Sequence, residues 1–236
     1  MHVPDGVLPL WLVLTMLGIS AVFLFASVKM VNRKFDDRLV PYMGVLAAVI
    51  FAAQLVNFPV PPFSSGHLVG SALLAIMLGP WAGMLIIALV LFVQALYGDG
   101  GILAYGLNFF NMGVLGCFAG WAIAILIFKW LTKVTEEKKS VLVATAISSF
   151  FTTIIAAFAL GLELLSVEGF TTLALSALVG VHVIIAVGEA ILATAVIAYF
   201  VKAKPSLISF LKDSDTREVS QVDKFPVSVS AGGSDE

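Results

Sequence analysis

The stretch "GHLVGSALLAIML" (residues 66–78), followed by Gly79-Pro80, determines how many times this chain crosses the membrane. It is apolar, but it is shorter than the roughly 20 residues that an α-helix needs to cross a bilayer. A Gly-Pro pair ends or kinks a helix, because proline lacks a backbone N–H and its ring clashes with the preceding turn. The stretch therefore either continues as one kinked helix with residues 81–97 or forms a separate short crossing.

Outside this stretch, the chain is a series of longer apolar segments. Of its 236 residues, 60% are hydrophobic and 12% are charged, whereas soluble domains are about half apolar and about a quarter charged. The composition predicts an all-α, multi-pass protein of the cell membrane. The segments whose length suits a membrane crossing are residues 8–31, 39–57, 81–97, 103–131, 140–163 and 172–201.

The distribution of positive charge favours one of these two membrane topologies. All 13 Lys and Arg residues lie in three clusters: residues 29–38, residues 129–139 and the chain from Lys202 onward. Basic residues collect in cytoplasmic loops. If residues 66–78 cross separately, all three clusters are cytoplasmic, whereas a single kinked crossing would turn the last two clusters outward. We therefore predict a bundle of seven transmembrane helices, with the amino terminus outside and the carboxyl terminus inside.

The chain divides into two regions. Residues 1–201 form the expected transmembrane domain. Residues 202–236 are polar, with little apolar periodicity in "KDSDTREVSQVDKFPVSVSAGGSDE", and we expect them to be a disordered cytoplasmic tail.

The predicted external face bears no Lys or Arg. It carries residues 1–5, the loop before His67 and the turn at residues 98–101. A face of this kind attracts cations. The preference of basic residues for the cytoplasmic side would by itself produce the same pattern, so both interpretations stay open.

The amino terminus, "MHVPDG", can act as a chelator. The amine of Met1, the backbone nitrogen of His2 and the His2 imidazole Nδ1 close a five-membered and a six-membered ring around a metal ion. Planar nitrogen ligation suits Ni(II) and Cu(II). His67 is the candidate for the fourth nitrogen, and Pro4 and Gly6 would turn the terminus back into the protein. Aminopeptidases remove Met1 only before a small residue, so we expect its amine to persist beside the bulky His2.

Residue types alone leave a second interpretation of these histidines. His2 would then be incidental, and His67 would cap a helix or contact lipid headgroups. His182 and Glu189 are a separate pair, seven residues apart on one face of the last apolar segment. They could line an ion path, but we favour a structural role, in which they bond to polar groups of other helices. The polar residues considered for such helix contacts are Asn57, Gln94, Asn108 and Asn111.

No nucleotide-binding or protease motif is present. The chain lacks the phosphate-binding Gly-x-x-x-x-Gly-Lys-[Ser/Thr] loop, so it cannot hydrolyse ATP by that mechanism. It also lacks a His-Glu-x-x-His motif and a Gly-x-Ser-x-Gly elbow. Nothing in it indicates nucleic-acid binding.

Five motifs in order resemble the CbiM/NikM family over residues 1 to about 201. They are "MHVPDG", "NFPVPPFSSGHLVG", "LGPWAG", "VQALYGDGGI" and "NFFNMG". This family provides the substrate-capture subunits of energy-coupling-factor (ECF) transporters for cobalt and nickel. The resemblance implies a seven-helix metal-capture domain, no enzymatic activity and no cofactor, with Ni(II) or Co(II) as the transported substrate. It implies metal ligation by Met1, His2 and His67.

The resemblance also implies partners, and it leaves the choice of metal open. The partners would be a membrane coupling subunit, two cytoplasmic ATPases and often a small accessory membrane protein. Cobalt-type members often have a Cys before the histidine, where this chain has Ser64-Ser65-Gly66, which favours nickel. Pro62 and Phe63 stand where the family often has two glycines, which leaves the path of this loop open. The alternatives are a capture subunit for an organic micronutrient and an intramembrane enzyme using His182 and Glu189.

Overall fold

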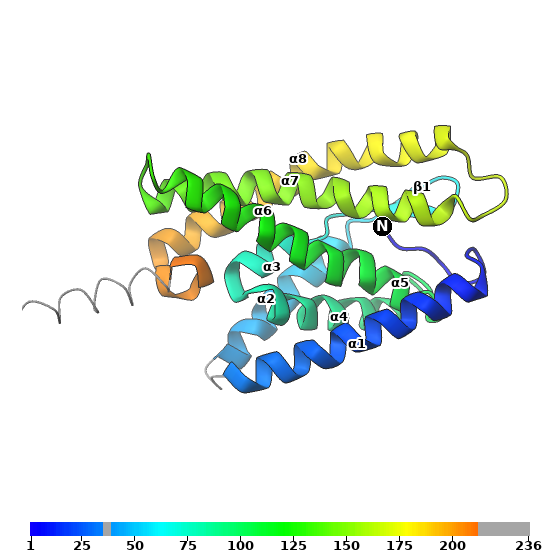
Figure 1. Ribbon diagram of the computed structural model, residues 1–236, viewed down its shortest axis with the longest axis horizontal. Coiled ribbons are helices and arrows are strands. Elements are labelled where there is room, and N and C mark those ends of the chain that lie inside the picture. Colours follow the sequence, from blue (N-terminus) through cyan, green and yellow to red (C-terminus); the bar gives the residue numbers. More distant parts are fainter. Residues whose placement is uncertain (35–38, 212–236) are drawn as a thin grey trace, which may run out of the picture.

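The computed structural model describes residues 1–34 and 39–211 of the chain. Within them, helices make up nearly all of the regular structure, and a single short hairpin pairs two strands. The elements, labelled in Figure 1, are α1 (Leu10–Lys34), α2 (Leu39–Gln54), β1 (Phe58–Val60), β2 (Ser64–Gly66), α3 (Ser71–Leu78), α4 (Pro80–Leu96), α5 (Tyr105–Phe109), η1 (Phe110–Leu115), α6 (Gly116–Leu131), α7 (Glu137–Leu164), α8 (Thr172–Ala203) and η2 (Pro205–Leu207).

Four helical spans are long and apolar enough to cross a membrane. They are Leu10–Arg33, Tyr105–Leu131, Glu137–Leu164 and Thr172–Ala203. The second span joins α5, η1 and α6 into one rod whose middle is π-helical. The described residues thus agree with a helical, multi-pass membrane protein, and crossing by the shorter α2, α3 and α4 stays a prediction.

Residues 66–78 do not form one helix with residues 81–97. Gly66 lies in β2, and only Ser71–Leu78 is helical, about 12 Å long at 1.5 Å per residue. Gly79 has a φ of 84°, which an L side chain rarely adopts, and Pro80 opens α4. A Cβ on Gly83 would lie 3.3 Å from the backbone of Leu74 and of Ala75, so α4 folds back beside α3.

Short α3 is the centre of the core. Its residues from Ser71 to Met77 are all buried, and it packs against α4, α6 and α7. A Cβ on Gly120 of α6 would lie 2.8 Å from the Ala72 Cα, so glycine is what admits α3 at this point. Small residues at such contacts let helix backbones approach closely in a membrane.

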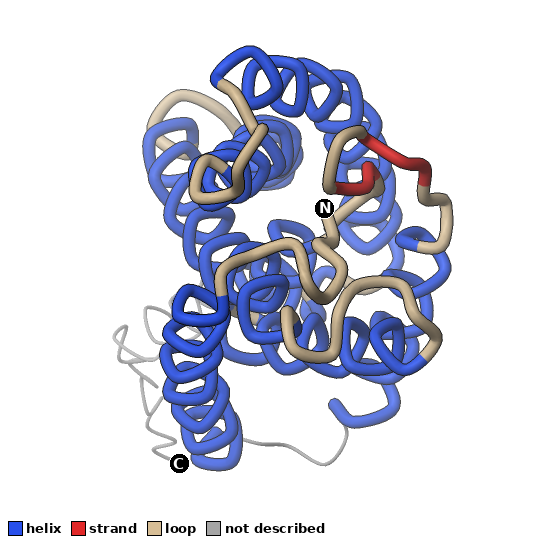
Figure 2. Tube along the Cα trace, turned by 90° about the vertical axis from the view of Figure 1, so that its right-hand side faces the viewer, coloured by secondary structure: helices blue, strands red, loops and turns tan. Residues whose placement is uncertain are grey.

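The two ends of the bundle differ in charge. Every Lys and Arg that the structure describes lies at or near the left-hand end in Figure 1, where α1, α6 and α8 end and α7 begins. The hairpin, the α4–α5 connection and the α7–α8 connection lie at the other end. Figure 2 faces that end and shows the amino terminus in its centre, beside the strands.

The packed chain continues beyond residue 201, where we placed the domain boundary. Helix α8 runs to Ala203, and Ile208, Phe210 and Leu211 are buried. The Phe210 ring lies 5.6 Å from that of Phe128 on α6. Residues 202–211 therefore belong with the bundle, and the rest of the predicted tail, residues 212–236, lies outside the described residues.

Candidate metal centre

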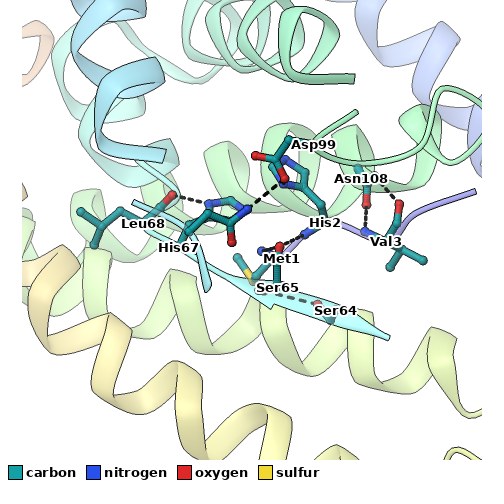
Figure 3. A network of polar contacts seen from close by, with 10 residues as sticks. Met1, His2, Val3, Ser64, Ser65, His67, Leu68, Asp99 and Asn108 are labelled. Carbon is teal, nitrogen blue, oxygen red and sulfur yellow. Dashed lines mark hydrogen bonds and ion pairs between the residues drawn. The ribbon is translucent and has the colours of Figure 1, made fainter. Parts of the chain in front are cut away.

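The first three residues of the chain are buried inside the bundle. Met1 is 1% exposed, His2 4% and Val3 0%. The backbone N–H of Val3 donates to Asn108 Oδ1 at 3.0 Å, and Asn108 Nδ2 donates to the Val3 carbonyl at 3.1 Å. Asn108 thereby pairs with both polar groups of Val3 as a neighbouring strand would. Figure 3 shows this contact and the groups around it.

A turn after Val3 holds the terminus in place. Gly6 has a φ of 83°, and the Asp5 carboxylate accepts hydrogen bonds from the N–H groups of Ile102 and Ala104, at 3.0 and 2.9 Å. A Cβ on Gly101 would lie 2.0 Å from Asp5 Oδ1, so only glycine fits there. The predicted return of the terminus into the protein is confirmed.

The β1–β2 hairpin brings Ser65 to the amino terminus. The strands pair in antiparallel register, with Phe58 opposite Gly66. The Ser65 hydroxyl oxygen lies 3.3 Å from the Met1 amine and 3.1 Å from the backbone nitrogen of His2, and accepts a hydrogen bond from each. The two nitrogen atoms that would form a five-membered chelate ring therefore already point toward one common position.

The two histidines meet at this position. Their rings are stacked, with centroids 4.5 Å apart and planes at 26°. His67 Nδ1 donates to the Leu68 carbonyl at 2.7 Å, which leaves its Nε2 with a free lone pair. Among the described residues, Nε2 of His67 and Nε2 of His2 are buried without a hydrogen-bond partner.

Asp99 engages the other nitrogen of the His2 ring. Its Oδ1 lies 3.1 Å from His2 Nδ1 and also accepts a hydrogen bond from Asn57 Nδ2 at 2.9 Å. The Asp99 side chain is 30% exposed and lines a cavity of about 440 Å³, which His2, Ser65 and the hairpin also line. The cavity opens to the outside of the protein and gives access to the site.

Burial disfavours the charged forms of the nitrogen groups of the site. It lowers the pKa of the Met1 amine well below its usual value, although Asp99 opposes the shift. It also lowers the pKa of His2, although the hydrogen bond that His2 donates to Asp99 opposes the shift, and it lowers the pKa of His67, where the nearby amine adds to the effect. The hydrogen bond with His2 lowers the pKa of Asp99. Neutral amines and imidazoles are the forms that bind metals.

The donor set is unusual because it uses the main chain. The described residues contain no group of three or more His, Cys, Asp or Glu side chains that could hold a metal ion. The site gathers an amine, an amide nitrogen and two imidazoles. For the predicted chelate, His2 Nδ1 would have to exchange Asp99 for the metal, because in the structure it faces that carboxylate.

His182 and Glu189 bond to backbone groups, and not to the polar side chains that were considered for them. His182 Nδ1 donates to the Leu178 carbonyl of its own helix at 2.8 Å, and Glu189 accepts from the backbone of residues 69 and 70. Asn108 is taken by Val3, and Asn111 donates to Glu163 at 2.6 Å. The buried N–H groups of Val69 and Gly70 lie outside any helix or strand and require an acceptor, which the Glu189 carboxylate supplies.

Besides Asn108, which was expected to contact another helix, two polar residues of the site were not identified from the sequence as contacting the terminus. They are Ser65 and Asp99, which follow the motifs "NFPVPPFS" and "VQALYG". Only their position in the sequence could have pointed to them, since both lie in predicted external loops that also carry or adjoin predicted site residues. Which oxygen would reach His2 could not be read from spacing.

Comparison with known proteins gives consistent matches. The family model "Cobalt uptake substrate-specific transmembrane region" (CbiM) matches residues 2–207. A predicted metal transport protein of Haloquadratum walsbyi is 34% identical, over 88% of this chain and 93% of its own. A predicted fused nickel transport protein of Archaeoglobus fulgidus is 41% identical, over 52% of this chain and 41% of its own. A crystal structure of a transition metal transporter is 31% identical, with a TM-score of 0.77, covering 92% of this chain and 99% of that one.

Proposed function

Since this chain belongs to the CbiM family of cobalt uptake transmembrane proteins, we propose that it is the substrate-capture subunit of an ECF importer for Ni(II) or Co(II). It is a multi-pass membrane protein of cobalt and nickel transport and not an enzyme. The finer proposal is that the metal is taken from the external face. Its ligands are the Met1 amine, the amide nitrogen and imidazole of His2, and the His67 imidazole.

One observation carries this proposal. The Met1 amine and the His2 amide nitrogen both point to the Ser65 hydroxyl, and the His2 and His67 rings are stacked beside them. A polar cluster so deeply buried is costly unless its groups find partners. Among the described residues, the proposed ligand atom of His67, Nε2, is buried without a hydrogen-bond partner and keeps a free lone pair, as an imidazole that binds a cation requires.

Metal binding would rearrange two hydrogen bonds. The His2 amide would lose its proton and its bond to Ser65, and the His2 ring would turn Nδ1 from Asp99 toward the metal. Asp99 would then face the positive charge of the complex from the mouth of the cavity. Three nitrogens of one short stretch are nearly planar in such a chelate, and His67 would complete the square.

This arrangement favours nickel. Ni(II) accepts planar four-nitrogen ligation, whereas Co(II) generally takes further ligands. The chain also has Ser64-Ser65-Gly66 in front of the histidine, with hydroxyls and no thiolate. We therefore place Ni(II) first and Co(II) second as the substrate.

Transport requires other chains. This chain lacks the nucleotide-binding loop, so the energy for import would come from two cytoplasmic ATPases acting through a membrane coupling subunit, with a small accessory membrane protein as a further partner. Within the described residues, the basic end of the bundle lies opposite the site. We propose that this basic end is cytoplasmic.

The test is to block the amine. A variant with one residue added before Met1 moves the amine along the chain and disrupts the five-membered ring, while both histidines remain. A carboxyl-terminal tag leaves the site untouched and serves as the matched control. Calorimetric titration with Ni(II) and with Co(II) should show high affinity only for the control. Equal affinity in the two proteins would remove the amine from the ligand set.

A further inference from the structure

The segment that carries His67 has no regular secondary structure. Residues 67–70 join β2 to α3 inside the bundle, and their backbone groups need partners there. Two side chains from different helices supply them. Glu189 of α8 accepts from the N–H groups of Val69 and Gly70, at 2.7 and 2.6 Å. Gln54 of α2 donates from Nε2 to the Val69 carbonyl at 2.7 Å.

Burying the ionisable side chain of Glu189 in the bundle costs free energy. It is 3% exposed in the middle of a membrane-spanning helix, where ionisable groups are rare and usually functional. Both of its carboxylate oxygens are used on two adjacent amides, so the segment is fixed in direction as well as in position. The space left between Gln54, Val69 and Glu189 is about 10 Å³, which is no more than one water molecule occupies.

This clamp is connected to the metal site through the backbone. The His67 ring is oriented by its Nδ1–H bond to the Leu68 carbonyl, and the next two amides along the chain are the ones that Glu189 holds. Helix α8 also contacts the near side of the segment, since a Cβ on Gly66 would lie 2.9 Å from Ile185 Cδ1. A shift of the amides at 69 and 70 would move the carbonyl that aims the ring.

We propose that Glu189, with Gln54 as its counterpart, is a positioning residue for metal capture that keeps His67 Nε2 at the metal position. This inference rests on the proposed function, because it takes His67 to be a ligand. Groups that orient metal ligands through hydrogen bonds typically contribute about 10- to 100-fold to metal affinity. Glu189 would do so from another helix, through two backbone amides.

The test compares E189Q with H67A and with a matched control. Gln keeps the volume of Glu189 but turns an NH₂ group toward one of the two backbone N–H groups. E163Q is the control. Like Glu189, Glu163 lies on a membrane-spanning helix and accepts a hydrogen bond, in this case from Asn111. Among the described residues, no hydrogen bond or ion pair joins it to the proposed ligands. Ni(II) affinity is measured by calorimetry, the coordination by the visible absorption of bound Ni(II), and folding by thermal unfolding in detergent.

We expect E189Q to bind Ni(II) about 10- to 100-fold more weakly, with the absorption spectrum of H67A, while E163Q binds as the unaltered protein does. A folded E189Q with unaltered affinity and spectrum, beside an impaired H67A, would overturn the role of Glu189 and leave the proposed function standing. Equal weakening in E189Q and E163Q would also overturn that role. Unaltered binding in H67A would overturn the proposed site itself.

If E189Q does not fold, the same measurements are made on Q54M. It removes the donor to the Val69 carbonyl and puts an apolar side chain of similar size in its place. Weakened Ni(II) binding with the H67A spectrum supports the clamp. Unaltered affinity and spectrum in Q54M overturn it.

Discussion

At the residue scale, Asn108 determines where the amino terminus lies. Its amide group pairs with both polar groups of Val3, and Gly101 adds a second bond to the same carbonyl. The position of the Met1 amine therefore depends on a side chain more than a hundred residues away. The ligand geometry and the packing of α5 are linked through this contact.

Asn108→Ala is expected to weaken both stability and metal binding. It leaves the buried Val3 N–H without a partner, which costs about 1–3 kcal/mol, and it frees the terminus. Ni(II) affinity should fall more than tenfold. Asn111→Ala is the control, because Asn111 bonds to Glu163 and not to the terminus. Thermal unfolding and calorimetry of both variants check this, and equal losses of affinity would contradict it.

The buried nitrogens also predict how many protons leave on binding. Burial lowers the pKa of the Met1 amine, His2 and His67, so these groups should hold fewer protons at pH 7 than exposed ones and have fewer to lose. Only the His2 amide proton should be released, about one per metal ion, whereas an exposed amine with a pKa near 8 would release about one more.

Calorimetry in buffers with different ionisation enthalpies measures this number. With one proton released, affinity should rise about tenfold per pH unit between pH 6.5 and 8. Because burial lowers the pKa of His2 and His67, protonation of these imidazoles should weaken binding only at a lower pH than it would for exposed ones. A release of two or more protons at pH 7 would contradict the neutral, buried state.

At the element scale, the contact between α3 and α6 depends on glycine. Gly120→Ala would place a methyl group 2.8 Å from the Ala72 Cα, a backbone atom that cannot move without shifting α3. Overpacking of this kind costs about 1–3 kcal/mol. Gly18→Ala in α1 is the control, since a Cβ there meets nothing within 4 Å. Thermal unfolding should show a lowered Tm for Gly120→Ala alone, and an unchanged Tm in both would contradict the close contact.

The sequence predicted the long helices well and the segment around His67 poorly. Hydrophobic length is a local property, so the spans of α1, α7 and α8 could be read directly. The sequence predicts a short crossing over residues 66–78, but residues 67–70 have no regular structure, and Glu189 holds the amides of residues 69 and 70, a contact that no local pattern reveals. The same holds for the packing of Phe210 on α6, since nearby polar residues masked an apolar cluster.

The proposed ligands of the candidate site could be named from the sequence, but their surroundings could not. His2 and His67 stand out because the chain has only three histidines, and the chelate follows from covalent geometry. Whether they meet depends on the hairpin, Ser65 and Asp99, which are brought together by contacts across 63 and 97 residues of the chain. Spacing within one segment carries no information on such contacts.

At the scale of the whole molecule, the basic residues predict orientation. Tyr97 is 83% exposed at the end with the site, and Val134 is 75% exposed at the basic end. Single cysteines at these positions, in a Cys117→Ala background, should therefore differ in access to a membrane-impermeant thiol reagent. We expect Tyr97→Cys to react in intact cells and Val134→Cys to react only after lysis. The reverse pattern would invert the proposed topology.

The hydrogen bonds between Glu189 and residues 69 and 70 have a consequence for biosynthesis. They join residues 120 and 119 positions apart. At about 5–20 residues per second, the ribosome needs roughly 6 to 24 s to reach Glu189 after the His67 segment has been made. A nascent chain without α8 would hold both histidines but would lack the group that aligns the second one. Half-made chains at the membrane would then not sequester scarce metal, and the capacity to capture it would arise late, when nearly the whole protein has been synthesised.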